Sequence, residues 1–129
     1  MDTRTKIVSA EQAAQIATEA RAAGRRVVLA AGSFDVLHAA HARFFTSLRD
    51  LDAVLLVVVY DDATAQPVLA AQARAQMVAA LAAVGHVILC PQLELEALIA
   101  RLAPDRVERA VPGERNIIGE VLERHKSSP

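Results

Sequence analysis

Two histidines stand three residues apart in the stretch "GSFDVLHAAH", which spans residues 32–41 and follows an apolar run that ends at Gly32. Residues three apart lie on one side of a helical turn, so His38 and His41 share a side if a helix begins near residue 38. Free backbone N–H groups at a helix N-terminus attract anions, and imidazole N–H groups donate to phosphate oxygens. The pair is therefore a candidate phosphate site; a partly exposed polar pair is the alternative.

Nucleotidyl or phosphoryl transfer is the chemistry that suits such a site. It needs in-line positioning and donors aimed at the charge that develops on the phosphorus oxygens, with little covalent chemistry from the protein. Gly32 lets backbone approach a ligand, and Asp35 is a candidate to fix a loop amide or orient a metal-bound triphosphate. A zinc site is disfavoured because the only cysteine, Cys90, lies in another predicted strand and no third ligand is evident.

The hydrophobic pattern indicates the elements that position these residues. Ser9 and Gln12 have the spacing of a capping box, which predicts a helix to about Ala23 with Gly24 as its C′ residue. Apolar, β-branched runs predict strands over 26–31, 53–60 and 86–90, and a short one over 105–111. Helical patterns predict helices over 38–50, 70–84, 93–102 and 114–125, followed by a tail over 126–129.

The helix predicted over 70–84 rests on one apolar stripe. Its members recur at helical spacing and are Leu69, Ala73, Met77, Leu81 and Val84. The strand over 53–60 shows no polar alternation, which is typical of burial on both faces.

Buried strands that alternate with helices predict a Rossmann-like α/β/α sandwich with a mostly parallel sheet of four to five strands. Residues 1–129 are expected to form a single domain. Ligands in such sheets bind beyond the carboxyl ends of the strands, at the switch point. Three loops should therefore meet at that edge, namely 32–38, 61–69 and 111–114.

Composition argues against several classes of partner. Aromatic residues make up 3% of the chain and there is no tryptophan, so base-stacking platforms are not expected. The formal net charge is -1 and no basic stripe is present, which argues against nucleic acid and anionic membranes. The longest apolar run is too short to span a bilayer, and the N-terminus lacks an apolar signal region. With one cysteine, we predict a soluble cytoplasmic protein.

The stretch at 32–41 resembles the G-x-F-D-x-L-H-x-G-H signature of the cytidylyltransferase-like nucleotidyltransferases, which is specific in spacing and residue types. "LLVVVYDD" occupies the place of that family's second strand and trailing aspartate. "QPVLAAQARAQMVAALAAVGHVIL" is similar to its arginine-bearing helix and third strand. The resemblance covers roughly residues 7–110 and is nearest to the adenylyltransferase domains of heptose-phosphate enzymes. Glycerol-phosphate and ethanolamine-phosphate cytidylyltransferases are less similar.

The resemblance implies that His38 and His41 are catalytic, holding the nucleotide phosphates and stabilising the pentavalent transition state. It also implies a set of nucleotide-binding residues, in which Arg74 matches a helix arginine that contacts phosphate. These are Gly32, Ser33, Phe34, Asp35, Ala40, Arg74 and Arg115. The implied reaction joins ATP or CTP to a phosphorylated sugar or polyol and releases pyrophosphate, with Mg²⁺ bridging the nucleotide phosphates. We expect no metal site made by protein side chains alone. We also expect the protein to form a homodimer.

Three departures from the family pattern point to weaker triphosphate binding. Ala40 stands where the family has glycine, so an extra methyl group faces any closely approaching nucleotide. The loop over 61–67 has no basic residue where the family has a lysine, and Gln66 replaces an arginine. "GER" at 113–115 replaces a hydroxyl cluster before the last helix, where Arg115 either substitutes for the lost partners or is solvated.

Three hypotheses therefore stand together. The first is an active nucleotidyltransferase, the second a nucleotide-binding or sensing module that has lost catalysis, and the third a structural domain that mediates assembly. Of the remaining polar residues, Asp61 and Asp62 either meet magnesium or cap a loop. Arg43 is expected to face solvent or pair with an acid, His86 to be structural and Cys90 to be a buried thiol.

Overall fold

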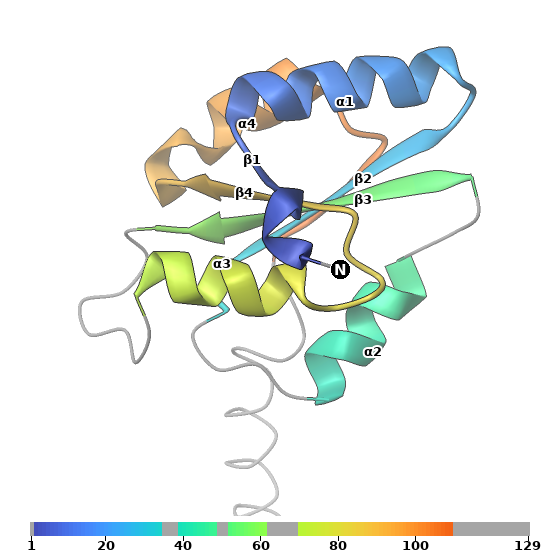
Figure 1. The fold of residues 1–129 in the computed structure, drawn as a ribbon. Coiled ribbons are helices and arrows are strands. Elements are labelled where there is room, and N and C mark those ends of the chain that lie inside the picture. Colours follow the sequence, from blue (N-terminus) through green and yellow to red (C-terminus); the bar gives the residue numbers. More distant parts are fainter. Residues whose placement is uncertain (1, 35–38, 49–51, 62–69, 110–129) are drawn as a thin grey trace, which may run out of the picture.

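The computed structural model describes residues 2–34, 39–48, 52–61 and 70–109. Within these ranges, a five-stranded sheet lies between helices on its two faces (Figure 1). The strands are β1 (Ile7–Val8), β2 (Arg26–Gly32), β3 (Ala53–Tyr60), β4 (His86–Cys90) and β5 (Arg106–Glu108). The helices are α1 (Ala10–Ala22), α2 (Ala39–Leu48), α3 (Ala71–Ala79) and α4 (Leu95–Leu102), with 3-10 turns η1 (Thr3–Lys6) and η2 (Gln92–Glu94). The helix predicted over 114–125 and the loop at 111–114 lie outside the described residues.

Every strand pair in the sheet is parallel, and the order is β1-β4-β3-β2-β5. This confirms the predicted Rossmann-like α/β class. All eight residues of β3 are buried, because helices cover both faces of the sheet. The two-residue strand β1 was not predicted, since so short a segment carries no periodic signal.

Two hydrophobic clusters separate the faces of the sheet. On one face, α1 and α4 contribute Ala13, Ala17, Leu98 and Leu102 to a cluster with alternate residues of β2 and β3. On the other face, α2 and α3 pack onto the remaining residues of these strands (Figure 1). The sandwich therefore buries all of β3, and all of β2 after Arg26.

The capping box predicted for α1 is confirmed. The Gln12 N–H donates to Ser9 Oγ at 3.1 Å, and the Ser9 N–H donates to Gln12 Oε1 at 2.8 Å. Gly24 follows the helix with a φ of 77°, in the left-handed region that favours glycine.

The prediction for α3 is wrong in both length and orientation. The helix ends at Ala79 and not at residue 84, and Met77, placed in the apolar stripe, is 42% exposed. The buried residues of α3 are Arg74, Ala75, Val78 and Ala79. The stripe was placed on the wrong side because an arginine in the middle of the inward face weakens the apolar signal of that face.

The chain after α3 turns back to the sheet instead of continuing as helix. The Lys6 ammonium donates to the carbonyl oxygens of Leu81 and Val84 at 3.2 and 2.8 Å. These bonds satisfy carbonyl groups in the turn beyond the helix end. The Gly85 N–H donates to the Leu55 carbonyl at 3.0 Å and leads into β4.

Candidate functional site

The strand order reverses at β2, which has β3 on one side and β5 on the other. In open α/β sheets, ligands bind beyond the carboxyl ends of the strands at such a point. Ser33 and Phe34 follow β2 directly, and Asp61 follows β3. We call this side of the sheet the carboxyl edge. Two of the three predicted loops thus begin there; residues 62–69 and 111–114 lie outside the described residues.

Phe34 makes a strained turn at the end of β2. Its φ is 51°, which costs a residue with a side chain about 1–2 kcal/mol. The ring is 1% exposed, and its centroid lies 5.5 Å from that of Phe45. Packing of this ring holds the backbone in the left-handed conformation, and conformations of this kind cluster at functional sites.

His41 is buried in the first turn of α2. The side chain is 0% exposed, and its ring centroid lies 5.8 Å from that of Phe34 with the planes at 70°. The alternative of a partly exposed polar residue is therefore wrong for His41. Ala40 lies in the same turn, whereas Asp35, His38 and Arg115 are outside the described residues. The histidine pair and the effect of the Ala40 methyl group remain predictions.

Arg74 reaches the carboxyl edge from the buried face of α3. The side chain is 2% exposed, so Arg74 does not face solvent. Its Nη1 donates to the Ser33 carbonyl at 2.6 Å and to the Tyr60 carbonyl at 2.7 Å. Buried charges are costly unless they are hydrogen-bonded, and charge-assisted bonds of this kind are among the strong ones. One guanidinium nitrogen thus joins the ends of β2 and β3.

Sequence reasoning missed this contact, although the sequence holds a signal for it. Ala71, Ala75, Val78 and Ala79 form a second apolar face at helical spacing, and Arg74 stands in the middle of that face. An arginine so placed either leaves the face unburied or finds buried acceptors. In this structure it finds carbonyl groups at two strand ends.

The described residues offer few groups for a metal ion. Asp61 is exposed beyond β3, and its N–H donates to the Cys90 carbonyl at 3.2 Å. In the described ranges, no group of three or more His, Cys, Asp and Glu side chains is placed to hold a metal ion. Cys90 itself is a buried thiol that forms no disulfide, in agreement with the predicted core thiol.

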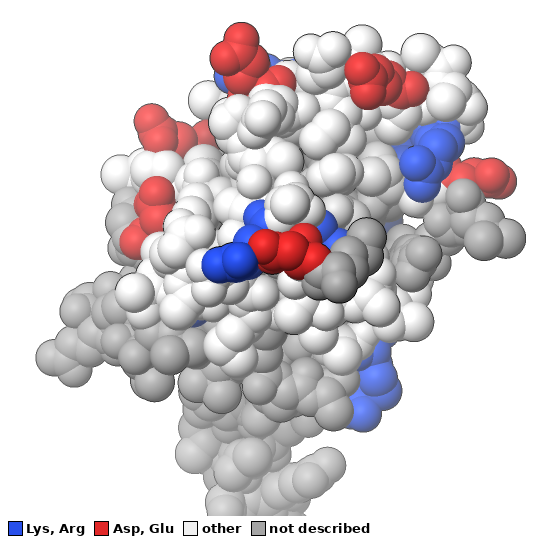
Figure 2. All heavy atoms as spheres, viewed as in Figure 1, with Lys and Arg blue, Asp and Glu red and all other residues white. Residues whose placement is uncertain are grey.

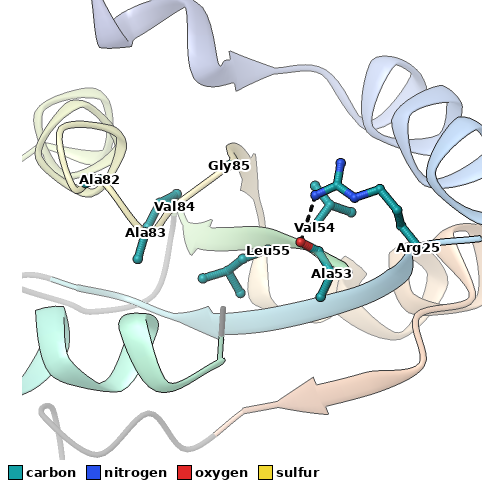
Figure 3. Close-up of a pocket in the computed structure, with 8 residues that line it drawn as sticks. All are labelled: Arg25, Ala53, Val54, Leu55, Ala82, Ala83, Val84 and Gly85. Carbon is teal, nitrogen blue, oxygen red and sulfur yellow. Dashed lines mark hydrogen bonds between the residues drawn. The ribbon is translucent and has the colours of Figure 1, made fainter. Parts of the chain in front are cut away.

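The hollow in Figure 3 lies where the strands begin, at the end of the sheet opposite to the carboxyl edge. We call this end the amino edge. The hollow measures about 120 Å³ and is bordered by the start of β3, the turn before β4 and Arg25. Arg25 Nη2 donates there to the Ala53 carbonyl at 2.9 Å. Because the hollow is remote from the switch point, it does not contribute to the candidate site.

His86 starts β4 at the amino edge, in agreement with a structural role. Burial lowers the pKa of its imidazole below the ordinary value of 6.5, and the Lys6 ammonium lowers it further. Its Nδ1 is buried with no hydrogen-bond partner among the described residues. A protonated His86 is therefore disfavoured in the folded protein.

On the face shown in Figure 2, basic and acidic side chains are interspersed among uncharged ones. Arg43 on α2 is exposed, as predicted. In the described part of the chain, no helix reaches the length and hydropathy of a bilayer-spanning segment.

These features define a Rossmann-like α/β domain with a buried histidine and a strained turn at its switch point. The chain belongs to the cytidylyltransferase-like family, whose profile matches residues 29–125. This confirms the resemblance predicted from residues 32–41.

Relatives and a solved structure agree with that assignment. The bifunctional protein HldE of Shewanella sp. (strain ANA-3) is 36% identical over 106 residues, which cover 77% of this chain and 22% of that protein. HldE of Campylobacter curvus (strain 525.92) is 34% identical over 107 residues, which cover 78% of this chain and 22% of that protein. The chain thus spans about a fifth of the length of these curated relatives. The crystal structure of the lipopolysaccharide core biosynthesis protein from Thermoplasma volcanium GSS1 has a TM-score of 0.57 and 28% identity, over 64% of this chain and 71% of that one.

Proposed function

We propose that this chain is a nucleotidyltransferase that transfers AMP or CMP from an NTP to a phosphorylated sugar or polyol. The observation that carries the proposal is His41, buried in the first turn of α2 just beyond the switch-point strand of a cytidylyltransferase-like domain. The sequence resemblance to heptose-phosphate enzymes favours ATP over CTP. The same resemblance, and the HldE relatives, favour a sugar phosphate as acceptor.

In the proposed reaction, a phosphate oxygen of the acceptor attacks the α-phosphorus of the NTP. A new P–O bond forms, the bond to the bridging oxygen breaks, and pyrophosphate leaves with that electron pair. His41 and His38 donate hydrogen bonds to phosphate oxygens as negative charge develops on them. The backbone of residues 32–34 lines the triphosphate site, and the buried charge of Arg74 supports an anion at this edge.

Mg²⁺ would enter with the nucleotide and neutralise charge on the phosphates. Mg²⁺ in such sites is usually held by one or two carboxylates together with phosphate oxygens and water. Asp61, exposed beyond β3, fits that need as one carboxylate ligand.

The test is release of pyrophosphate in a coupled pyrophosphatase assay. Purified protein is mixed with Mg²⁺, ATP or CTP, and a panel of sugar and polyol phosphates. We expect release with at least one pair, and a loss of about 100-fold or more in His41→Gln. His86→Gln, a histidine variant at the amino edge, is the matched control and should retain activity. No release with any pair, while a control enzyme turns over the panel, would contradict the proposal.

A second candidate is a nucleotide-binding module that has lost catalysis. It is favoured by Ala40 at the glycine position and by the absence of basic residues over 61–67. Binding stabilises the folded state by about 2.7 kcal/mol when the ligand is at 100 times its Kd. A thermal shift with ATP or CTP without pyrophosphate release supports this candidate. If ATP and CTP cause no thermal shift and no pyrophosphate is released, the third hypothesis, a structural domain, is supported.

We further propose that the protein acts in the cytoplasm as a homodimer, without nucleic acid or membrane partners. The homodimer rests on the family resemblance, since the buried alanines of α1 and α3 pack against the sheet of their own copy. Sedimentation equilibrium of the purified chain tests the oligomeric state, because a mass of 13.8 kDa marks the monomer and twice that mass marks the dimer.

A further inference from the structure

Arg74 connects two strand ends that are distant in sequence. The Ser33 carbonyl lies at the end of β2, 41 residues before Arg74, and the Tyr60 carbonyl is the last of β3. Both bonds use the same nitrogen, Nη1, so the two carbonyl oxygens are held at one point. The side chain is almost completely buried, which limits its own freedom to move.

The bond to Ser33 fixes more than one oxygen atom. The Ser33–Phe34 peptide bond is trans and planar, so its C=O and N–H groups point in opposite directions. With the carbonyl held by Arg74, the Phe34 N–H must point away from the guanidinium. The orientation of this peptide is thus set from α3.

Phe34 carries the constraint to the histidine. Its left-handed backbone conformation begins at the peptide that Arg74 holds. Its buried ring then meets the His41 ring in an edge-on contact. A chain of direct contacts therefore runs from Arg74 through the Ser33–Phe34 peptide and the Phe34 ring to the imidazole of His41.

We infer that Arg74 is a positioning residue, which fixes the Ser33–Phe34 peptide at the end of β2 and, through the Phe34 ring, orients the His41 imidazole. The effect of Arg74 on nucleotide binding rests on the proposed function. The contact chain itself exists in the protein without nucleotide. The competing explanation is the role that the family resemblance implies, direct contact of Arg74 with phosphate.

The two explanations differ in the free protein. If Arg74 orients His41, replacing it changes the environment of the imidazole before any ligand is added. If Arg74 only contacts phosphate, the imidazole of the free protein is unaffected. Histidine ¹⁵N NMR reads this directly, with the His41 signals assigned by their loss in His41→Gln.

The experiment compares Arg74→Met, Arg74→Lys and Phe34→Leu with two matched controls, all well below their melting temperatures. Arg43→Met removes an exposed arginine from the helix that carries His41. Gly85→Ala lowers stability at the amino edge, and so reports what a general loss of stability does to the spectrum. We expect shifted or broadened His41 signals in the first three variants and unchanged signals in both controls.

Arg74→Lys keeps a positive charge but replaces the planar guanidinium with a single ammonium. We expect a smaller change in the His41 signals than in Arg74→Met. If Arg74→Met does not fold, Arg74→Lys and Phe34→Leu decide the question. Unchanged His41 signals in the folded variants would overturn the inference.

Nucleotide affinity gives the second readout. Misplaced binding groups should weaken ATP or CTP binding by about tenfold or more in Arg74→Met and in Phe34→Leu. Because both act through one contact chain, the double variant should lose little more than either single variant. Full additivity of the two losses would overturn the inference. If the wild-type chain binds no nucleotide, the proposed function fails, and the His41 signals still test the contact chain.

Discussion

The two edges of the sheet use similar groups in different ways. At the amino edge, the exposed Arg25 and the half-buried Lys6 donate to carbonyl groups of turns and strand starts. At the carboxyl edge, Arg74 makes the same kind of bond but is buried, next to a strained phenylalanine. The side chains at the amino edge satisfy backbone carbonyl groups. At the carboxyl edge, Arg74 also fixes the Ser33–Phe34 peptide, and the Phe34 ring packs against the proposed nucleotide-binding residue His41.

The hydrogen bonds at the start of β5 resemble those at the rest of the amino edge, because they only satisfy backbone groups. The Val27 N–H donates to the Asp105 carboxylate at 2.7 Å, and the Asp105 N–H returns a bond to the Val27 carbonyl at 2.8 Å. Asp105 is exposed and simply extends the pairing of β2 and β5 by one residue. Burial and strain together, rather than charge alone, distinguish the candidate site.

The largest effect on stability is expected from Arg74→Met. It leaves the half-buried Ser33 carbonyl and the buried Tyr60 carbonyl without this donor, which should lower the free energy of unfolding by about 2–4 kcal/mol. Arg25→Met, at the amino edge, should cost less than about 1 kcal/mol because the lost donor is replaced by water. Urea denaturation of both variants measures the difference; equal losses would contradict the distinction between the edges.

Gly85→Ala should produce the next largest loss. A Cβ atom at this position would lie 2.9 Å from the Leu55 backbone oxygen, so the strand must shift. We expect a loss of about 1–3 kcal/mol, measured as a lower urea midpoint. Nucleotide affinity should stay unchanged, because the clash lies at the amino edge. A loss of affinity matching that of Arg74→Met would show that the edges are coupled.

Ala103→Gly should have the opposite sign. Ala103 caps α4 with a φ of 46°, where glycine is favoured by about 1 kcal/mol. The variant should therefore melt at a higher temperature than the wild type. Ala100→Gly, in the exposed part of the same helix, is the matched control and should melt at a lower temperature. A lower melting temperature for Ala103→Gly would contradict the assigned backbone strain.

The smallest effect concerns pH. Because the folded pKa of His86 is lowered, the unfolded chain binds the proton at higher pH than the folded protein does. Stability due to neutral His86 is thus fully present above pH 6.5 and is lost as the pH falls through the lowered folded pKa. His86→Gln should flatten this decline in urea titrations between neutral and mildly acidic pH. An unchanged decline would contradict the burial of the imidazole.

Much of the fold could be predicted from local patterns. The capping box at Ser9 and the uninterrupted apolar run of β3 depend on neighbouring residues alone, and both were found in the sequence. The orientation of α3 was not, because it depends on Arg74 having acceptors that lie far away in the chain. β1 consists of two residues and is a strand only because β4 is beside it.

The candidate site shows the same division. Residue types and spacing identified the segment at 32–41 and its place at a strand end. Neither the positive φ of Phe34 nor its contact with His41 follows from the sequence, since both depend on packing against Phe45 and the sheet. A family signature thus indicates which residues form a site, and the tertiary contacts indicate how they are held.

The most direct test of the central claim compares histidines at the two edges during one titration. ATP or CTP with Mg²⁺ is added to ¹⁵N-labelled protein, and the imidazole signals of His41 and His86 are followed. The claim that nucleotide phosphates bind at the carboxyl edge predicts saturable shifts for His41 and none for His86. Saturable binding that moves His86 and leaves His41 unchanged, or no binding of either nucleotide, would contradict it.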